Sequence, residues 1–240
     1  MKQHLYILTG ASRGMGQAMA KQLLQPGHTL LCISRHSQPE LNDLVDTVDD
    51  ATLAQWSLDL VDGAAAGAQL SRWMSLFLGD EFDSATLINN AALLPRISAL
   101  ADASSADIAN VLRVGLEAPM QLTAAFLRAT ANWSGARRVL NISSGNGRRA
   151  MASQSIYSAV KAGMDHYTRC VALEEAARTN GAKVCSLAPG IIDTDMQTHI
   201  RATNPADFPS HATFVEYKNN GDLLTPEAGA ARVLTYLASA

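Results

Sequence analysis

Tyr157 and Lys161 stand four residues apart in segment 155–180, where apolar residues recur at three- and four-residue spacing. This spacing is typical of an amphipathic helix, on which residues four apart project from one face. A free tyrosine has a pKa of about 10, and a nearby ammonium together with an oxidised nicotinamide would favour its phenolate. The pair could therefore transfer a proton near neutral pH, although a YxxxK pattern alone also arises by chance as a surface pair.

Two serines shortly before this helix offer a partner for the tyrosine. Ser143 and Ser144 end the apolar run 137–143, which is typical of a strand. A serine hydroxyl at the carboxyl end of a parallel strand can hydrogen-bond a carbonyl oxygen and orient it for protonation by Tyr157. Either serine fits this role, and the alternative is that each only caps the turn.

A glycine-rich loop, Thr9–Gly16, follows the first apolar run and leads into a helical pattern. Glycines allow a tight turn and a close approach to a pyrophosphate, which then meets free N–H groups at the start of a helix. We expect this loop to bind a dinucleotide through the following residues: Gly10, Ser12, Arg13, Gly14, Met15 and Gly16.

The end of the second apolar run selects between the two nicotinamide cofactors. Ser34 and Arg35 stand where an acidic residue would bind a ribose 2′-hydroxyl, and Arg13 could converge on the same phosphate. Two arginines favour NADP(H), although an arginine in such a loop is by default a solvated charge. Asp59, followed by Leu60, is expected at the adenine amino group, with capping of the next helix as the alternative.

Short apolar runs alternate with helical patterns along the whole chain. The expected strands are 5–9, 28–34, 52–58, 84–90, 137–143 and 182–188, and the expected helices are 14–25, 62–78, 104–131 and 155–180. Parallel strands need such crossovers, which place helices on both faces of the sheet. The sequence therefore predicts one α/β domain over 1–240, a Rossmann-like doubly wound parallel sheet with six evident strands.

The pattern loosens after residue 193. Segment 193–224 shows little periodicity and is predicted to be a mobile segment that covers the substrate. A last helix begins after Thr225, with Pro226 in its first position and Glu227 in its first turn.

Composition restricts the classes of partner. A net charge of −3 gives no basic field for nucleic acid, and no apolar run reaches the roughly 20 residues that span a bilayer. The N-terminal residues also lack the pattern of a signal peptide, so we expect a cytoplasmic protein. Cys32, Cys170 and Cys185 lie in apolar stretches without metal-ligand spacing and are interpreted as core thiols, with no structural metal.

Four motifs together resemble those of the short-chain dehydrogenase/reductase family over essentially the whole chain. They are TGxxxGxG at 9–16, the sequence Asn89-Asn90-Ala91-Ala92 in place of NNAG, the set Ser144, Tyr157 and Lys161, and Pro189-Gly190. Residues 34–35, 141–145 and 189–197 further resemble the branch that contains sepiapterin reductase and bacterial benzil reductase.

The resemblance implies roles for individual residues. It selects Ser144, 13 residues before Tyr157, over Ser143, and implies that Lys161 holds the ribose hydroxyls of the nicotinamide. It further implies that Ile192, through its backbone, and Thr194 hold the carboxamide. The remaining cofactor-binding residues that it implies are Asn90, Ala91, Tyr157, Pro189, Gly190 and Met196.

Three departures from the family pattern stand out. Ala92 replaces a glycine, which matters only if that position needs a positive φ. Gly115 replaces an asparagine that in the family holds a water leading from the lysine, so local helix distortion or another water path is expected. The usual seventh strand has no counterpart before Ala240, which would leave one sheet edge uncovered.

The expected function is NADPH-dependent reduction of a ketone or diketone, with Tyr157 as the proton donor. The alternatives are a nucleotide-sensing regulatory protein without turnover and an NAD-dependent alcohol dehydrogenase. Met151, Met196 and Leu94 predict an apolar substrate pocket or, alternatively, packing of the covering segment. Helices 104–131 and 155–180 resemble the family's dimer-forming pair, so a homodimer is expected unless their apolar faces are buried within the chain.

Overall fold

A single parallel sheet organises the chain. The structure is a computed structural model that describes residues 2–239. Its strands run in the order β3-β2-β1-β4-β5-β6, and every neighbouring pair is parallel. They are β1 (His4–Thr9), β2 (His28–Ser34), β3 (Thr52–Ser57), β4 (Ser84–Asn89), β5 (Ala136–Ile142) and β6 (Lys183–Leu187). The doubly wound sheet of six strands is therefore confirmed, and each predicted strand is correct to within one residue at either end.

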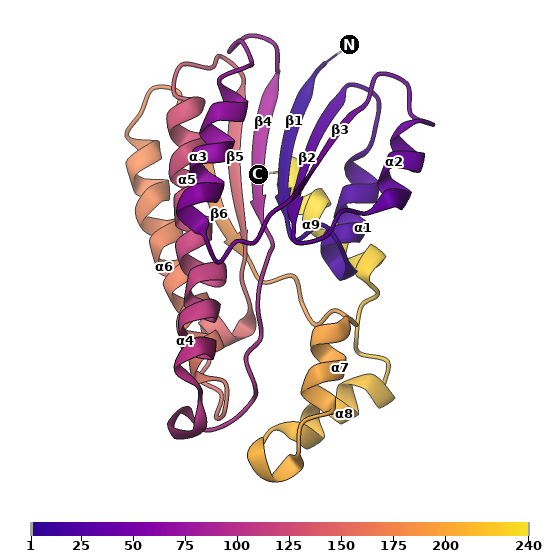
Figure 1. The fold of residues 1–240 in the computed structure, drawn as a ribbon, viewed down its shortest axis with the longest axis vertical. Coiled ribbons are helices and arrows are strands. Elements are labelled where there is room, and N and C mark those ends of the chain that lie inside the picture. The colour runs from indigo at the N-terminus through magenta and orange to yellow at the C-terminus, as the bar shows by residue number, and fades with distance from the viewer. Residues whose placement is uncertain (1, 240) are drawn as a thin grey trace.

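Helices cover both faces of this sheet (Figure 1). One face carries α1 (Gly14–Leu23), α2 (Pro39–Val45) and α9 (Pro226–Ser239), and the other carries α3 (Gly63–Met74), α5 (Ala118–Ala129) and α6 (Ser155–Ala176). The predicted helix 104–131 consists of α4 (Ser105–Leu112), a π-helical turn at Arg113–Glu117, and α5. Short 3₁₀ turns lie at Leu100–Asp102, Gly145–Gly147 and Pro205–Asp207.

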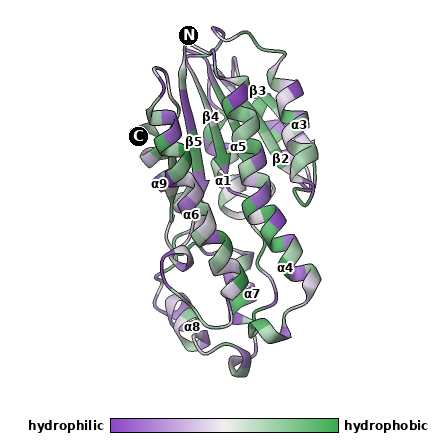
Figure 2. Ribbon diagram, turned by 90° about the vertical axis from the view of Figure 1, so that its left-hand side faces the viewer, coloured by the Kyte–Doolittle hydropathy of each residue, from purple (hydrophilic) through white to green (hydrophobic). Residues whose placement is uncertain are grey.

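The central strands β1, β2 and β4 are mostly apolar because both of their faces are buried. Leu31 and Leu87 pack beneath α3 and α5, whereas their neighbours Leu30 and Ile88 pack beneath α1 and α9. Successive strand residues point to opposite faces, so a continuous apolar run supplies both cores. The covering helices α4 and α5 show hydrophobic and hydrophilic residues in alternating patches, as amphipathic helices do (Figure 2).

Segment 193–224 contains two helices that its sequence pattern does not indicate. It contains α7 (Asp195–Arg201) and α8 (His211–Asn219), which lie beyond the carboxyl end of the sheet (Figure 1). These helices are short, and they are held by contacts distant in sequence, since Ile200, Phe208 and Phe214 pack with Ile97. The weak periodicity of the segment thus did not indicate these helices, while its mobility and its role in covering the substrate remain predictions.

The structure also bears on three smaller expectations, which concern the cap of α9, the cysteines and membrane-spanning helices. The Thr225 side chain accepts a hydrogen bond from the Ala228 N–H at 3.1 Å and so caps α9 as predicted. Cys170 is exposed on α6, so the core assignment was wrong for this thiol, because apolar neighbours in a helix do not fix which face a residue occupies. None of the helices in residues 2–239 is long and apolar enough to cross a membrane.

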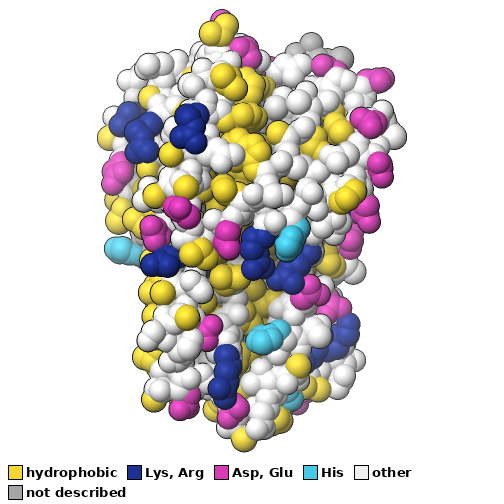
Figure 3. All heavy atoms as spheres, in the orientation of Figure 1, with side chains coloured by type: hydrophobic (Ala, Val, Ile, Leu, Met, Phe, Trp, Pro, Cys, Tyr) yellow, Lys and Arg dark blue, Asp and Glu magenta, His cyan; other side chains and the backbone are white. Residues whose placement is uncertain are grey.

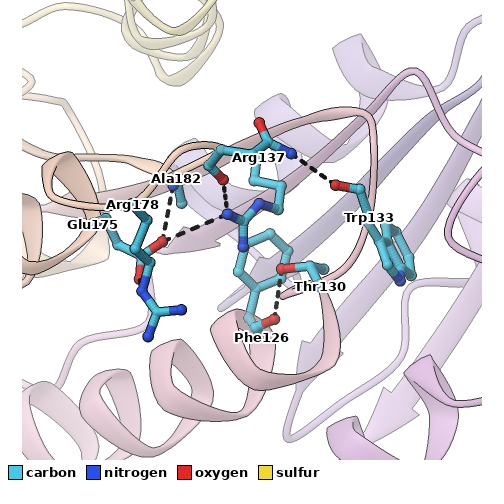
Figure 4. Close-up of polar contacts among 8 residues, drawn as sticks. Phe126, Thr130, Trp133, Arg137, Glu175, Arg178 and Ala182 are labelled. Atoms are coloured by element: carbon cyan, nitrogen blue, oxygen red, sulfur yellow. Dashed lines mark hydrogen bonds and ion pairs between the residues drawn. The ribbon is translucent and has the colours of Figure 1, made fainter.

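A buried ion pair fixes the turn between α6 and β6. Glu175 and Arg137 are each 5% exposed, with 3.7 Å between Oε2 and Nη2 (Figure 4). Glu175 also accepts the Ala182 N–H at 2.9 Å and pairs with Arg178 at 3.1 Å, while Arg137 donates to the Asn180 carbonyl. The carboxylate thus holds β5, α6 and the start of β6 together.

Glu175→Gln is expected to lower the free energy of unfolding by about 3 kcal/mol, because it leaves the buried Arg137 guanidinium without its counter-charge. Urea unfolding followed by circular dichroism measures the change. Glu174→Gln, on the exposed neighbour, is the matched control and should stay within about 0.5 kcal/mol of the wild type. Equal effects of the two substitutions would refute the structural role of this pair.

Candidate active site

A cavity of about 790 Å³ opens at the carboxyl edge of the sheet, between the strand ends and α7. All the residues predicted above for catalysis and cofactor binding line it. They are Gly10, Ser12, Arg13, Gly14, Met15, Gly16, Ser34, Arg35, Asp59, Leu60, Asn90, Ala91, Ser144, Tyr157, Lys161, Pro189, Gly190, Ile192, Thr194 and Met196. On the face shown in Figure 3, Lys, Arg and His side chains gather across the middle, at the height where the sheet gives way to α7 and α8.

The glycine loop has the backbone that a pyrophosphate site needs. Gly10 and Gly14 have φ values of +70° and +54°, which side chains disfavour, and a Cβ at Gly16 would lie 2.0 Å from the Gly10 carbonyl oxygen. The Thr9 hydroxyl accepts the N–H groups of Asn90 and Ala91, both at 3.0 Å. The loop is therefore tied to the end of β4, and its backbone at the start of α1 fits a dinucleotide phosphate.

The residues expected to select the cofactor lie along the far wall of the cavity. Arg35 is exposed, and among residues 2–239 no ion-pair partner is found for it. Ser34 donates to the His36 carbonyl at 2.8 Å. Asp59 accepts the Val61 N–H, whereas Asp62 caps α3, so the alternative role of Asp59 as the helix cap does not hold.

Tyr157, Lys161 and Ser144 converge at the inner end of the cavity. Lys161 is 2% exposed, and its Nζ donates to the Ile142 carbonyl at 2.7 Å and lies 5.7 Å from the Tyr157 ring centroid. The Ser144 hydroxyl accepts the Asn146 N–H at 3.3 Å, and it lies close enough to the Tyr157 phenol to influence the pKa of that phenol. The Ser143 hydroxyl is buried and, within the described part of the chain, has no hydrogen-bond partner.

Burial dominates the electrostatics of this group. It raises the pKa of Tyr157 to about 12, against the opposing effect of the Ser144 hydrogen bond. It also lowers the pKa of Lys161 to about 8, although the Asp165 carboxylate counteracts this shift. Loss of solvation therefore outweighs the ammonium 5.7 Å from the ring centroid, while the lowering expected from Lys161 together with an oxidised nicotinamide remains a prediction.

Comparison with known families decides the classification. The family described as short chain dehydrogenase matches residues 4–205, most of the chain. The chain belongs to this family. Short-chain dehydrogenases are oxidoreductases that use nicotinamide cofactors, and the resemblance seen in the sequence motifs is confirmed.

Individual relatives are similar over nearly the full length of this short-chain dehydrogenase. A benzil reductase ((S)-benzoin forming) of Bacillus cereus is 36% identical over 231 residues, 96% of this chain and 92% of the relative. The sepiapterin reductase of Mus musculus is 32% identical, covering 96% and 90%. A crystal structure of a putative 2-deoxy-d-gluconate 3-dehydrogenase from Agrobacterium tumefaciens with bound NADP has a TM-score of 0.76 and 28% identity, covering 97% and 88%.

This short-chain dehydrogenase packs a valine side chain beside its departure at Gly115. Gly115 is buried in the π-helical turn, and a Cβ there would lie 2.6 Å from Cγ1 of Val160, the residue before Lys161. The valine side chain thus fills the space beside residue 115. The expected helix distortion is confirmed by the π-helical turn, while the path of the proton remains a prediction.

The other departures impose little strain. The described non-glycine residues with positive φ are Asp50 and Ser153, so Ala92 has no need of glycine. β6 lies at one edge of the sheet, as expected without a seventh strand among residues 2–239.

Several polar residues of the cavity were not found from the sequence. Asn110, Asn146, Gln154, Gln197 and Arg201 all line it. Asn146 donates to the Gln154 side chain at 2.5 Å beside Ser144. The position of Gln154, three residues before Tyr157 and at the start of the same helix, is the signal that could have indicated it.

Gly115→Ala is expected to lower the free energy of unfolding, because overpacking costs about 1–3 kcal/mol and exceeds the gain in helix propensity of about 1 kcal/mol. Val160→Ala opens the space that the new methyl group needs. The double variant should therefore be more stable than the sum of the two single changes predicts, by at least about 0.5 kcal/mol. Urea unfolding of all four proteins measures this coupling, and strict additivity would contradict the Gly115–Val160 contact.

Proposed function

We propose that this short-chain dehydrogenase is an NADPH-dependent carbonyl reductase that converts a ketone or diketone to an alcohol, with Tyr157 as the proton donor. The observation on which this depends is the convergence of Ser144, Tyr157 and Lys161 at the inner end of the cavity that the glycine loop also lines. A protein that only senses a nucleotide has no need of a proton-transfer group in that position.

The geometry supports a separate chemical role for each of the three residues. The Ser144 hydroxyl binds and polarises the carbonyl oxygen, and Tyr157 donates its phenolic proton to that oxygen. A bound NADPH supplies the hydride that the carbonyl carbon receives. The high pKa of Tyr157 keeps the phenol protonated before reaction, and Lys161 stabilises the phenolate that remains.

The cavity wall opposite the catalytic group favours an apolar substrate. Leu94, Met196, Ile200 and Phe214 line the cavity and belong to one packed cluster, with Met151 packed against the same cluster outside the lining. Such a wall suits aromatic or bulky aliphatic groups beside the reacting carbonyl. The benzil reductase and sepiapterin reductase relatives make aromatic diketones and pterin ketones the first compounds to assay.

Two arginines support NADPH over NADH. Arg13 and Arg35 both line the cavity, and an arginine fork matches the oxygens of a 2′-phosphate. The similar Agrobacterium protein has NADP bound. A homodimer is also proposed, supported by exposed Leu112, Met120 and Leu173 on α4, α5 and α6.

Tyr157→Phe is expected to reduce kcat for carbonyl reduction by about 10²–10⁴-fold, because it removes the general acid. Oxidation of NADPH against a carbonyl panel that includes benzil measures the loss, and nucleotide fluorescence should show an NADPH Kd within threefold of the wild type. Tyr167→Phe, the same change on α6 outside the cavity lining, is the matched control and should retain activity. Activity retained by Tyr157→Phe would reject Tyr157 as the proton donor, and a wild type inactive on every carbonyl would favour the regulatory alternative.

Arg35→Asp is expected to shift the preference from NADPH toward NADH by tenfold or more in kcat/KM, since it replaces a phosphate-binding cation by an anion. Arg72→Asp, at an exposed position on α3 outside the cavity, makes the same charge change and should leave the ratio unchanged. An unchanged ratio in Arg35→Asp would show that the 2′-phosphate is held elsewhere, and a wild type that prefers NADH would favour the alcohol dehydrogenase alternative.

A further inference from the structure

The glycine loop and the start of α7 are joined across the cavity mouth. Arg13 Nη1 lies 2.9 Å from Asp195 Oδ2, although the two residues are 182 positions apart in the chain. The adjacent residues also approach each other, since a Cβ at Gly14 would lie 3.1 Å from Thr194 Cγ2. Arg13 therefore points to α7 in the protein without ligand.

Asp195 begins α7, and α7 and α8 contact the body through the apolar cluster around Ile97 and through a small set of polar contacts. Asp193 binds Lys218 at 2.6 Å and lies 3.7 Å from Arg201, so it links α7 to α8. The two ends of segment 193–224 are joined to each other, because the Asp193 N–H donates to the Leu224 carbonyl at 2.8 Å. At the other end, a weaker pair of 4.0 Å joins Arg96 and Asp207. The Arg13–Asp195 pair is thus the charged contact between α7 and the glycine loop.

From this geometry we infer that Asp195 is a cofactor-specificity residue that competes with the 2′-phosphate of NADPH for Arg13. The inference rests on the proposed function, in which Arg13 binds that phosphate. One guanidinium fork cannot present the same N–H groups to a carboxylate and a phosphate at once. Binding of NADPH therefore exchanges the partner of Arg13 and frees the first turn of α7 from the glycine loop, whereas NADH leaves the pair intact.

The exposure of the pair sets the size of the effect. The Arg13 and Asp195 side chains are 65% and 75% exposed, so solvent screens their attraction. The pair therefore opposes phosphate binding by a few-fold in Kd rather than by orders of magnitude. Added salt weakens it further.

The test measures the Kd values of NADPH and NADH by nucleotide fluorescence for the wild type, Asp195→Asn, Arg13→Met and the double variant. Asp195→Asn should tighten NADPH binding three- to tenfold and change NADH binding by less than twofold. In the Arg13→Met background the same substitution should have no effect, because the competing partner is absent.

Glu40→Gln is the matched control. It removes the same charge from the exposed Lys21–Glu40 pair, which lies at 2.7 Å between α1 and α2, and it should leave the ratio of the two Kd values unchanged. A similar change in Glu40→Gln, or an equal tightening of both nucleotides in Asp195→Asn, would mean that only the overall field has altered and would overturn the inference.

A second measurement follows α7 directly. Amide hydrogen exchange over residues 196–201 should be faster with saturating 2′-AMP than with 5′-AMP, and equal in Arg13→Met. Equal exchange with both nucleotides in the wild type contradicts the release of the first turn of α7.

A wild type that binds NADH as tightly as NADPH contradicts the proposed cofactor, and the inference falls with it. A wild type that prefers NADPH, with an Asp195→Asn variant that behaves like it, contradicts the inference alone.

Discussion

A buried ammonium, hydrogen-bonded to the last carbonyl of a strand, is the interaction on which the rest of the site depends. Lys161 Nζ donates to the carbonyl of Ile142, where β5 ends, and burial of a charge is costly without such a partner. The lysine position is therefore tied to the end of β5. Tyr157 lies one turn earlier on the same helix, and Ser144 lies two residues beyond the same strand, so both are placed relative to that one carbonyl.

The parallel sheet explains why so many separate segments meet at one edge. Its central strands are buried on both faces and are mostly apolar there, so most polar residues of the site collect where the strands end. All carboxyl ends point the same way, and the loops after all six strands therefore contribute to one cavity. This arrangement leaves the carboxyl ends of the strands open, and α7 and α8 partly cover them.

Local patterns predicted the sheet and the expected catalytic and cofactor-binding residues of the cavity, because the central strands are apolar runs and the glycine loop follows one directly. The pKa of Tyr157 could not be predicted, since its direction depends on burial by segments distant in sequence. The helices α7 and α8 were missed because they depend on contacts with Ile97 more than on their own amphipathic pattern. The Arg13–Asp195 pair joins residues that no local pattern connects.

The contact between Gly115 and Val160 also constrains how this protein can change through evolution. While valine occupies position 160, any side chain at position 115 meets its Cγ1, so an asparagine there carries a steric penalty. A smaller residue at position 160 removes that penalty. Packing beside Lys161 therefore sets the order in which these two positions can change without passing through a strained intermediate.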